Sequence, residues 1–197
     1  MLYGDVKREI KNLGFESEAT ILENAEIIAD SVNRAVSMIV SSVVPIVKKY
    51  SIVQESDAEA DGGYVSYVLP EIIPDFLDIF EKPKITVSDV RKTFCEYLIE
   101  GNKIMLVPAD FNGTIDVYYK AAPTVVTAET PDTFVMEPDL IVCPLIAPLA
   151  SYFVWLDDDE RKATMYYNIY DDMKNSILQN MSQRVPVQFS GGIRWGN

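Results

Sequence analysis

The spacing of apolar residues predicts helices in the first quarter of the chain. Residues 5–13 carry apolar side chains at helical intervals, and Gly14 follows as a C-cap. The next stretch repeats apolar residues every three or four positions, which predicts a helix from about residue 18 to residue 48. Pro45 should bend or end this helix about one turn earlier. The repeated positions suit either a protein core or a subunit interface. They are Ile21, Ala25, Ile28, Val32, Ala35, Ile39, Val43 and Ile46.

The middle of the chain changes to the two-residue period that is typical of strands. Residues 64–69 and 114–120 alternate apolar and polar side chains. Two apolar runs, at residues 94–99 and 103–107, are separated by a short segment with a central glycine, which predicts a hairpin. Prolines bound these strands. We interpret residues 50–126 as a small, mostly antiparallel β module inserted between helices.

The helical period returns after Pro138. Apolar residues recur on one face from Leu145 to Leu156 and again from Ala163 to Ile177. Between them lies an acidic corner in which Asp157 and Glu160 have the spacing of a capping box. The segment therefore predicts an αα-hairpin. Its aromatic side chains are interpreted as packing residues and not as a ligand pocket. They are Tyr152, Phe153, Trp155, Tyr166, Tyr167 and Tyr170.

Together these elements predict an α+β fold in three parts. A helical bundle, made of the long N-terminal helix and the C-terminal αα-hairpin, takes residues 1–49 and 127–181. The small antiparallel β module takes residues 50–126, and residues 182–197 form an extended C-terminal tail. The longest uncharged run, residues 140–156, is short for a membrane span and contains two prolines. No membrane partner and no signal peptide are therefore expected.

The C-terminal tail differs in charge from the rest of the chain. Residues 182–197 contain two arginines and no acid, whereas the whole chain has a net charge of −13. The tail also carries several apolar residues without helical periodicity. Such a segment suits either binding to a partner, upon which it becomes ordered, or a frayed terminus. The candidate partner-binding residues are Arg184, Val185, Pro186, Val187, Phe189, Ile193, Arg194 and Trp195.

The sequence offers little for catalysis. It contains no histidine, which excludes histidine-dependent nucleophiles and histidine metal ligands. It also lacks a phosphate-binding loop, a dinucleotide-binding turn and a nucleophile elbow. Cys95 and Cys143 form no metal or redox motif and are interpreted as small buried residues. We therefore expect no catalytic residues and no cofactor, although enzymes that use only carboxylates or a metal need no histidine.

Two acidic clusters resemble cation sites but have simpler explanations. Residues 57–62 begin like a calcium-binding loop, but Val68 stands at the twelfth position, where a bidentate glutamate is needed. Residues 157–160 lie where acids stabilise a helix N-terminus without any metal. We therefore expect no metal ligands. The net charge of −13 also argues against binding nucleic acid by neutralising its phosphates.

The C-terminal half carries a resemblance to a known family. Residues 144–155 form an apolar helix pattern, residues 157–160 an acidic turn, and residues 166–170 read Tyr-Tyr-Asn-Ile-Tyr. With the strand pattern at residues 113–123, this part resembles the head-to-tail adaptor proteins of tailed bacteriophages, also called head-completion, tail accessory or connector proteins. The resemblance is clear over residues 114–178 and loose before them.

The resemblance implies a virion structural protein and not an enzyme. Such adaptors form a ring, usually of twelve copies, which lies beneath the portal protein, extends the DNA channel and carries the tail. The implied partners are the portal protein, a tail or nozzle protein, other copies of the chain, and passing DNA that is not bound specifically. The resemblance also implies that the C-terminal tail binds the portal. The implied location is the virion neck, after assembly in the host cytoplasm.

Two other hypotheses stay open at this point. The chain could be another neck or tail-completion protein of the virion, which would also bind virion partners. It could instead be a virion-associated hydrolase that depends on carboxylates or a metal. The hydrolase would require carboxylates that converge in a cleft with raised pKa values.

Overall fold

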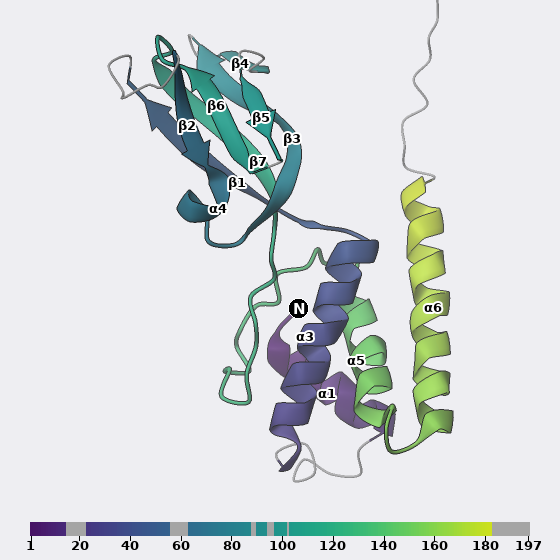
Figure 1. Ribbon diagram of the computed structural model, residues 1–197. Coiled ribbons are helices and arrows are strands. Elements are labelled where there is room, and N and C mark those ends of the chain that lie inside the picture. Colours follow the sequence, from purple (N-terminus) through teal and green to yellow (C-terminus); the bar gives the residue numbers. More distant parts are fainter. Residues whose placement is uncertain (15–22, 56–62, 88–89, 94–96, 102, 183–197) are drawn as a thin grey trace, which may run out of the picture.

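The computed structural model describes most of the chain as an α+β protein with helices at one end and strands at the other (Figure 1). The described residues are 1–14, 23–55, 63–87, 90–93, 97–101 and 103–182. Over them the chain starts in the helical part, builds the β part and returns to the helical part through a long segment without regular structure, residues 122–142. None of the described helices is both long enough and apolar enough to span a bilayer.

The helical part is organised around a central apolar helix. Its elements are α1 (Tyr3–Gly14), α3 (Ala25–Ser42), the 3-10 helix η1 (Cys143–Leu145), α5 (Ile146–Trp155) and α6 (Glu160–Ser182). Helices α1, α3 and α6 all contact α5, whose first six residues are fully buried or nearly so. A helix that is apolar around most of its circumference must be covered on several sides, which explains its central position.

The stripe predicted in the first long helix is largely confirmed. Ile28, Val32, Ala35 and Ile39 are 0% exposed and belong to the common core. The start of the stripe, with Ile21, lies outside the described residues. The predicted helix at residues 5–13 and the predicted αα-hairpin are also confirmed, as α1 and as α5 with α6.

The β part consists of two antiparallel sheets. The four-stranded sheet has the order β1-β7-β3-β4 and the three-stranded sheet the order β2-β6-β5. The strands are β1 (Ile46–Gln54), β2 (Tyr64–Val68), β3 (Phe76–Val87), β4 (Val90–Thr93), β5 (Leu98–Glu100), β6 (Ile104–Pro108) and β7 (Gly113–Ala121), with the short helix α4 (Leu69–Ile72) after β2. Buried residues of both sheets, such as Val117 of β7 and Val107 of β6, join the common core.

A buried glutamine links the two sheets. Gln54, at the end of β1, donates hydrogen bonds from Nε2 to the carbonyl oxygens of Pro108 (2.7 Å) and Phe111 (3.1 Å). Its Oε1 accepts a hydrogen bond from the hydroxyl of Tyr67 in β2 at 3.1 Å. Gln54 is only 1% exposed, and these three bonds give its amide group the hydrogen-bond partners that a buried polar side chain needs.

The predicted fold class, a helical bundle with a small inserted β module, is wrong. The β part is not small, because it contains two sheets, and β1, β3 and β4 were not predicted. Pro45 does end the preceding helix, at Ser42, as expected. The chain does not resume a helix after it: Ile46, placed in the helical stripe, instead begins β1.

Strand β3 escaped prediction because its alternation is interrupted. Its register with β7 shifts between Phe76 and Asp78, between Ile79 and Glu81, and between Glu81 and Lys84. Bulges of this kind break the two-residue period, and they also allow Pro83 to lie inside a strand. The predicted strands at residues 64–69 and 114–120 are confirmed as β2 and β7, and the predicted hairpin as β5 with β6.

Replacing Ile39 by alanine tests the importance of the helical core. Ile39 is 0% exposed on α3, so Ile39→Ala should lower the free energy of unfolding by about 2–5 kcal/mol. Ile27, on the same helix and 53% exposed, is the matched control, and Ile27→Ala should change it by less than about 0.5 kcal/mol. Urea denaturation of both variants measures the difference. Equal losses would contradict the core assignment.

Candidate functional site

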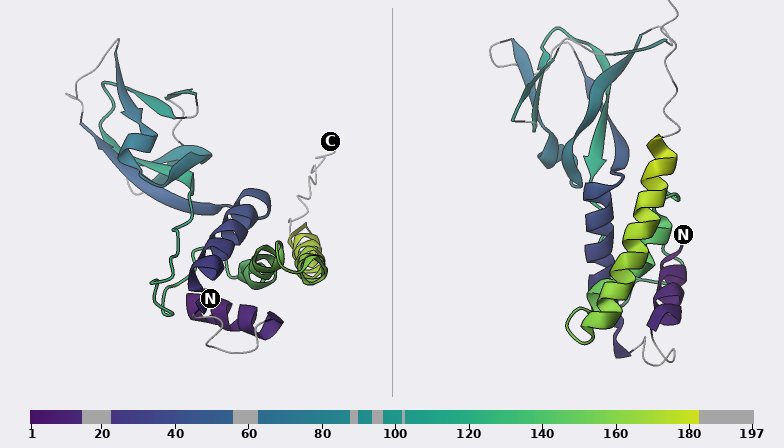
Figure 2. Two further views of the ribbon diagram at one scale, coloured as in Figure 1. Left: turned by 60° about the horizontal axis from the view of Figure 1, so that its bottom comes forward. Right: turned by 90° about the vertical axis from the view of Figure 1, so that its right-hand side faces the viewer.

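The tail residues predicted to bind a partner lie outside the described residues. Arg184 to Trp195 all follow Ser182, which is the last residue of α6 and the last described residue. The structure does show how α6 presents them. The helix starts at the end of the molecule away from the β part and runs beside α5, so that its last turns point toward the β part's end (Figures 1 and 2).

The acidic corner before α6 is a helix cap. Oδ1 of Asp159 accepts hydrogen bonds from the backbone N–H groups of Arg161 and Lys162, both at 3.1 Å. Asp159, and not Asp157 as predicted, is therefore the N-cap residue, because the helix begins at Glu160. Capping explains this acid without a cation.

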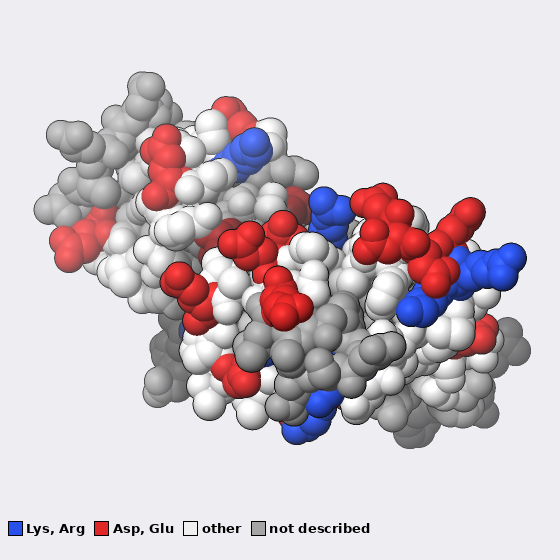
Figure 3. Space-filling view, turned by 90° about the horizontal axis from the view of Figure 1, so that it is seen from below, with Lys and Arg blue, Asp and Glu red and all other residues white. Residues whose placement is uncertain are grey.

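The end of the molecule that carries this corner is acidic. Asp157, Asp158 and Glu160 are exposed there, and so are Glu23 and Glu26 near the start of α3. Figure 3 views this end from below, and acidic side chains predominate on it. Such a face repels other acidic surfaces and nucleic acid.

Groups that could bind a metal ion do not cluster in the described part of the chain. Nowhere among the described residues do three or more His, Cys, Asp or Glu side chains come close enough to hold a metal ion. The calcium-like loop at residues 57–62 and Cys95 lie outside them. Cys143 is buried, burial raises the pKa of its thiol, and its Sγ donates to the carbonyl oxygen of Pro138 at 3.3 Å. Its position fits the predicted packing role.

The aromatic residues of the αα-hairpin pack against one another. The ring of Tyr152 lies 5.2 Å from that of Tyr167, which in turn lies 5.8 Å from that of Tyr170. Tyr166 and Tyr170 are buried. These centroid distances are typical of aromatic pairs in a core, which confirms the packing interpretation.

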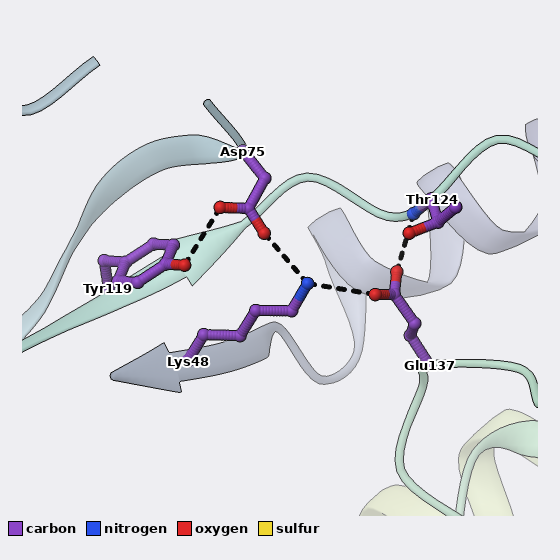
Figure 4. A network of polar contacts seen from close by, with 5 residues as sticks. All are labelled: Lys48, Asp75, Tyr119, Thr124 and Glu137. Atoms are coloured by element: carbon purple, nitrogen blue, oxygen red, sulfur yellow. Dashed lines mark hydrogen bonds and ion pairs between the residues drawn. The ribbon is translucent and has the colours of Figure 1, made fainter. Parts of the chain in front are cut away.

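The strongest polar feature lies where the helical and β parts meet (Figure 4). Nζ of Lys48 in β1 contacts Oδ2 of Asp75 at 2.8 Å and Oε1 of Glu137 at 2.9 Å. The hydroxyl of Tyr119 in β7 donates to Oδ1 of Asp75 at 2.9 Å. The backbone N–H of Thr124 donates to Oε2 of Glu137 at 2.6 Å. We call these five residues the junction network.

The junction network holds one cation between two anions. Hydrogen bonds to Asp75 and Glu137 raise the pKa of Lys48. Burial alone would raise the pKa of Asp75, but the hydrogen bonds from Lys48 and Tyr119 outweigh it and lower that pKa. Burial is likewise outweighed at Glu137, by Thr124 and Lys48, so its pKa is lowered. Burial and the bond to Asp75 raise the pKa of Tyr119 to about 12.

A second tie joins α3 to the same region. Nδ2 of Asn33 donates to the carbonyl oxygen of Val126 at 2.8 Å, and the N–H of Val126 donates to Oδ1 of Asn33 at 2.9 Å. The backbone N–H of Ala122 also donates to the carbonyl oxygen of Asp75 at 2.8 Å. The chain passes between the β part and the helical part twice, and side chains of both parts also contact the segment that joins them. These contacts restrict the movement of one part relative to the other.

An open groove lies beside this junction. Its volume is about 500 Å³, and most of its lining is apolar. We call it the junction groove. It is lined by Ser37, Val40, Ser41, Ser42, Val43, Pro45, Leu77, Lys120, Ala122 and Pro123. Leu77 is 55% exposed and Phe80, further along β3, is 49% exposed. The sequence did not reveal the groove, because three distant segments form it.

Replacing Lys48 by methionine tests the junction network. Two carboxylates would lose their shared cation, so Lys48→Met should lower the free energy of unfolding by about 1–2 kcal/mol, a value discounted for partial exposure. Lys49 neighbours it, has Asp116 at 3.3 Å as its one ion-pair partner among the described residues, and is more exposed. Lys49→Met should cost less than about 0.5 kcal/mol. Similar small losses in both variants would argue against the network.

The pH dependence of stability gives a separate test. Because the folded-state pKa values of Asp75 and Glu137 are lowered, their contribution is present at neutral pH and is lost as pH falls below about 4. The raised pKa of Lys48 keeps its contribution until pH exceeds about 10. The stability difference between the wild type and Lys48→Met should therefore be constant from pH 6 to about 9 and shrink in acid. A difference that grows on acidification would contradict this assignment.

Comparison with known proteins identifies the family. No curated protein matches the chain. The family model described as SU10 adaptor protein matches residues 1–194, which include the helical part, the β part and most of the tail. This match agrees with the resemblance found in the C-terminal half. The chain therefore belongs to the SU10 adaptor protein family, and so to the head-to-tail adaptor proteins of bacteriophages.

Proposed function

We propose that this chain is the subunit of a ring that joins the portal to the tail and extends the DNA channel. The observation that carries the proposal is the family match over residues 1–194, since it spans both parts of the fold. A subunit in such a ring must hold two partners at a fixed separation. The junction network suits that task because it ties the helical and β parts together.

The C-terminal tail is the proposed contact with the portal. Among the described residues, α6 is the element that leads to it, and Ser182 ends that helix away from the acidic end of the molecule. Its two arginines and its apolar side chains provide both charge and apolar contact area. The tail or nozzle protein would then meet another surface of the ring.

The charge of the chain suits a channel that DNA passes through without binding. Each copy carries a net charge of −13, and twelve copies would surround the DNA with an acidic wall. Proteins that hold DNA neutralise its phosphates with clustered lysine and arginine. An acidic wall instead repels the phosphates, so DNA can leave quickly. The proposed location of the ring is the virion neck, which the adaptor family supports.

Two features argue against the hydrolase hypothesis. A carboxylate-dependent hydrolase needs an acid with a raised pKa beside a second carboxylate. The paired carboxylates of the junction network, Asp75 and Glu137, have lowered pKa values and share Lys48. Burial and the nearby Asp5 do raise the pKa of Glu9, but this residue is exposed on α1. An adaptor family is also a family of structural proteins.

Deleting residues 182–197 tests the proposed role of the tail. The truncated chain should keep its fold, because it retains every core residue in the described part of the chain, and it should no longer bind the portal protein. Mass photometry of portal mixtures at low and high salt measures binding, and circular dichroism checks the fold. The double variant Arg184→Gln/Arg194→Gln separates charge from apolar contact. It should bind more weakly than the wild type at low salt, and the difference should shrink at high salt, where the charges are screened. Unchanged portal binding by a folded, truncated chain would refute the tail contact.

A further inference from the structure

The end of α6 extends its apolar stripe beyond the short helix that it packs against. Met173 and Ile177 still contact the core, but Leu178 is 39% exposed. The helix has 23 residues and is about 34 Å long, whereas α5, which it packs against, has 10 residues and is about 15 Å long. Its buried residues, Ala163, Tyr166 and Tyr170, all lie in the first half. The stripe nevertheless continues at the same spacing through half-buried Ile177 and Met181, beside Leu178.

The end of α6 also carries no charge. Residues 175–182 read Asn-Ser-Ile-Leu-Gln-Asn-Met-Ser, in a chain whose net charge is −13. Copies with such a charge repel one another, so contacts between them are favoured where acidic side chains are absent. An exposed, uncharged helix end with an apolar stripe is therefore suited to contact another copy.

The junction groove is a second surface with the same property. Residues 35–47, which form the last turns of α3 and the crossing to β1, contain no charged side chain. The single charged lining residue, Lys120, is paired with Asp78 at 3.1 Å. The apolar lining includes Val43 and the half-exposed Leu77. No residue of α6 lines the groove, so a copy does not fill it with its own helix end.

We propose that the end of α6, residues 175–182, packs into the junction groove of the next copy. The two surfaces are different, so the contact is heterologous. When each copy makes this contact with the next and the last copy meets the first, the copies form a closed ring. The inference rests on the proposed ring and names the surfaces that would form it. It also buries the exposed apolar surface at the end of the stripe, since an apolar helix face binds in apolar grooves. The segment beyond residue 182 stays available for the portal.

Mixed crosslinking tests the contact, with one cysteine added to a chain whose two native cysteines are first removed by Cys95→Ser and Cys143→Ala. Leu178→Cys marks the helix end and Ser41→Cys marks the exposed rim of the groove. Rings assembled from an equal mixture, with portal protein if it is needed, are treated with a short bis-maleimide. Crosslinked dimers should form in the mixture and not with either variant alone or with the cysteine-free chain. Dimers from Leu178→Cys alone would show a contact between two helix ends and would overturn the proposal.

A matched pair of charge variants provides the second measurement. Leu178→Glu places an acid beside the stripe and should reduce the fraction of assembled rings roughly tenfold or more. Gln179→Glu adds the same charge one residue further on, on the opposite side of the helix from Ile177, and should assemble normally. Rings that form with Leu178→Glu as readily as with the wild type, without mixed crosslinks, would overturn this contact and leave the ring intact. Absence of any ring, with or without portal protein, would instead reject the ring itself.

Discussion

The position of the β part relative to the helices depends on one shared ammonium group. Lys48 contacts Asp75, at the turn into β3, and Glu137, in the segment that returns to the helices. Tyr119 and Thr124 hold the same two carboxylates from β7 and from the chain just after it. Either carboxylate alone would be a partly buried charge with an incomplete set of partners. Through Lys48, the two carboxylates hold the start of β1, where the chain enters the β part, next to the segment that returns to the helices. Two hydrogen bonds between Asn33 and Val126 connect this returning segment to α3.

Membership of a phage adaptor family makes the chain a structural protein of the virion neck. In the proposed ring, a net charge of −13 on each copy would keep DNA from adhering, but it would also make the copies repel one another. The molecule separates these effects in space. Acidic side chains collect at the end formed by the α5–α6 corner, whereas the end of α6 and the junction groove carry almost no charge. Association can then use surfaces on which the repulsion is weakest.

The sequence predicted the elements that bury a single face without interruption. Helices α1, α3 and α6 and strand β7 show regular periods because one side of each meets the core, whereas α5, which is buried on several sides, lies in the longest uncharged run of the chain. Strand β1 was missed because Ile46 continues the helical spacing, and β3 because bulges break its alternation. The junction network could not be predicted, since its residues lie in four distant segments that only the fold brings together. The capping acid was placed two residues too early. The partner-binding tail, from Arg184 to Trp195, stays a prediction.

Electron microscopy of the full chain mixed with the portal protein tests the central claim most directly. The account predicts a second ring, coaxial with the portal, in which neighbouring copies are in contact and a central channel stays open. Class averages with this ring would support the adaptor role and give its copy number. Portal particles without added density, or with isolated copies attached at the periphery, would contradict it.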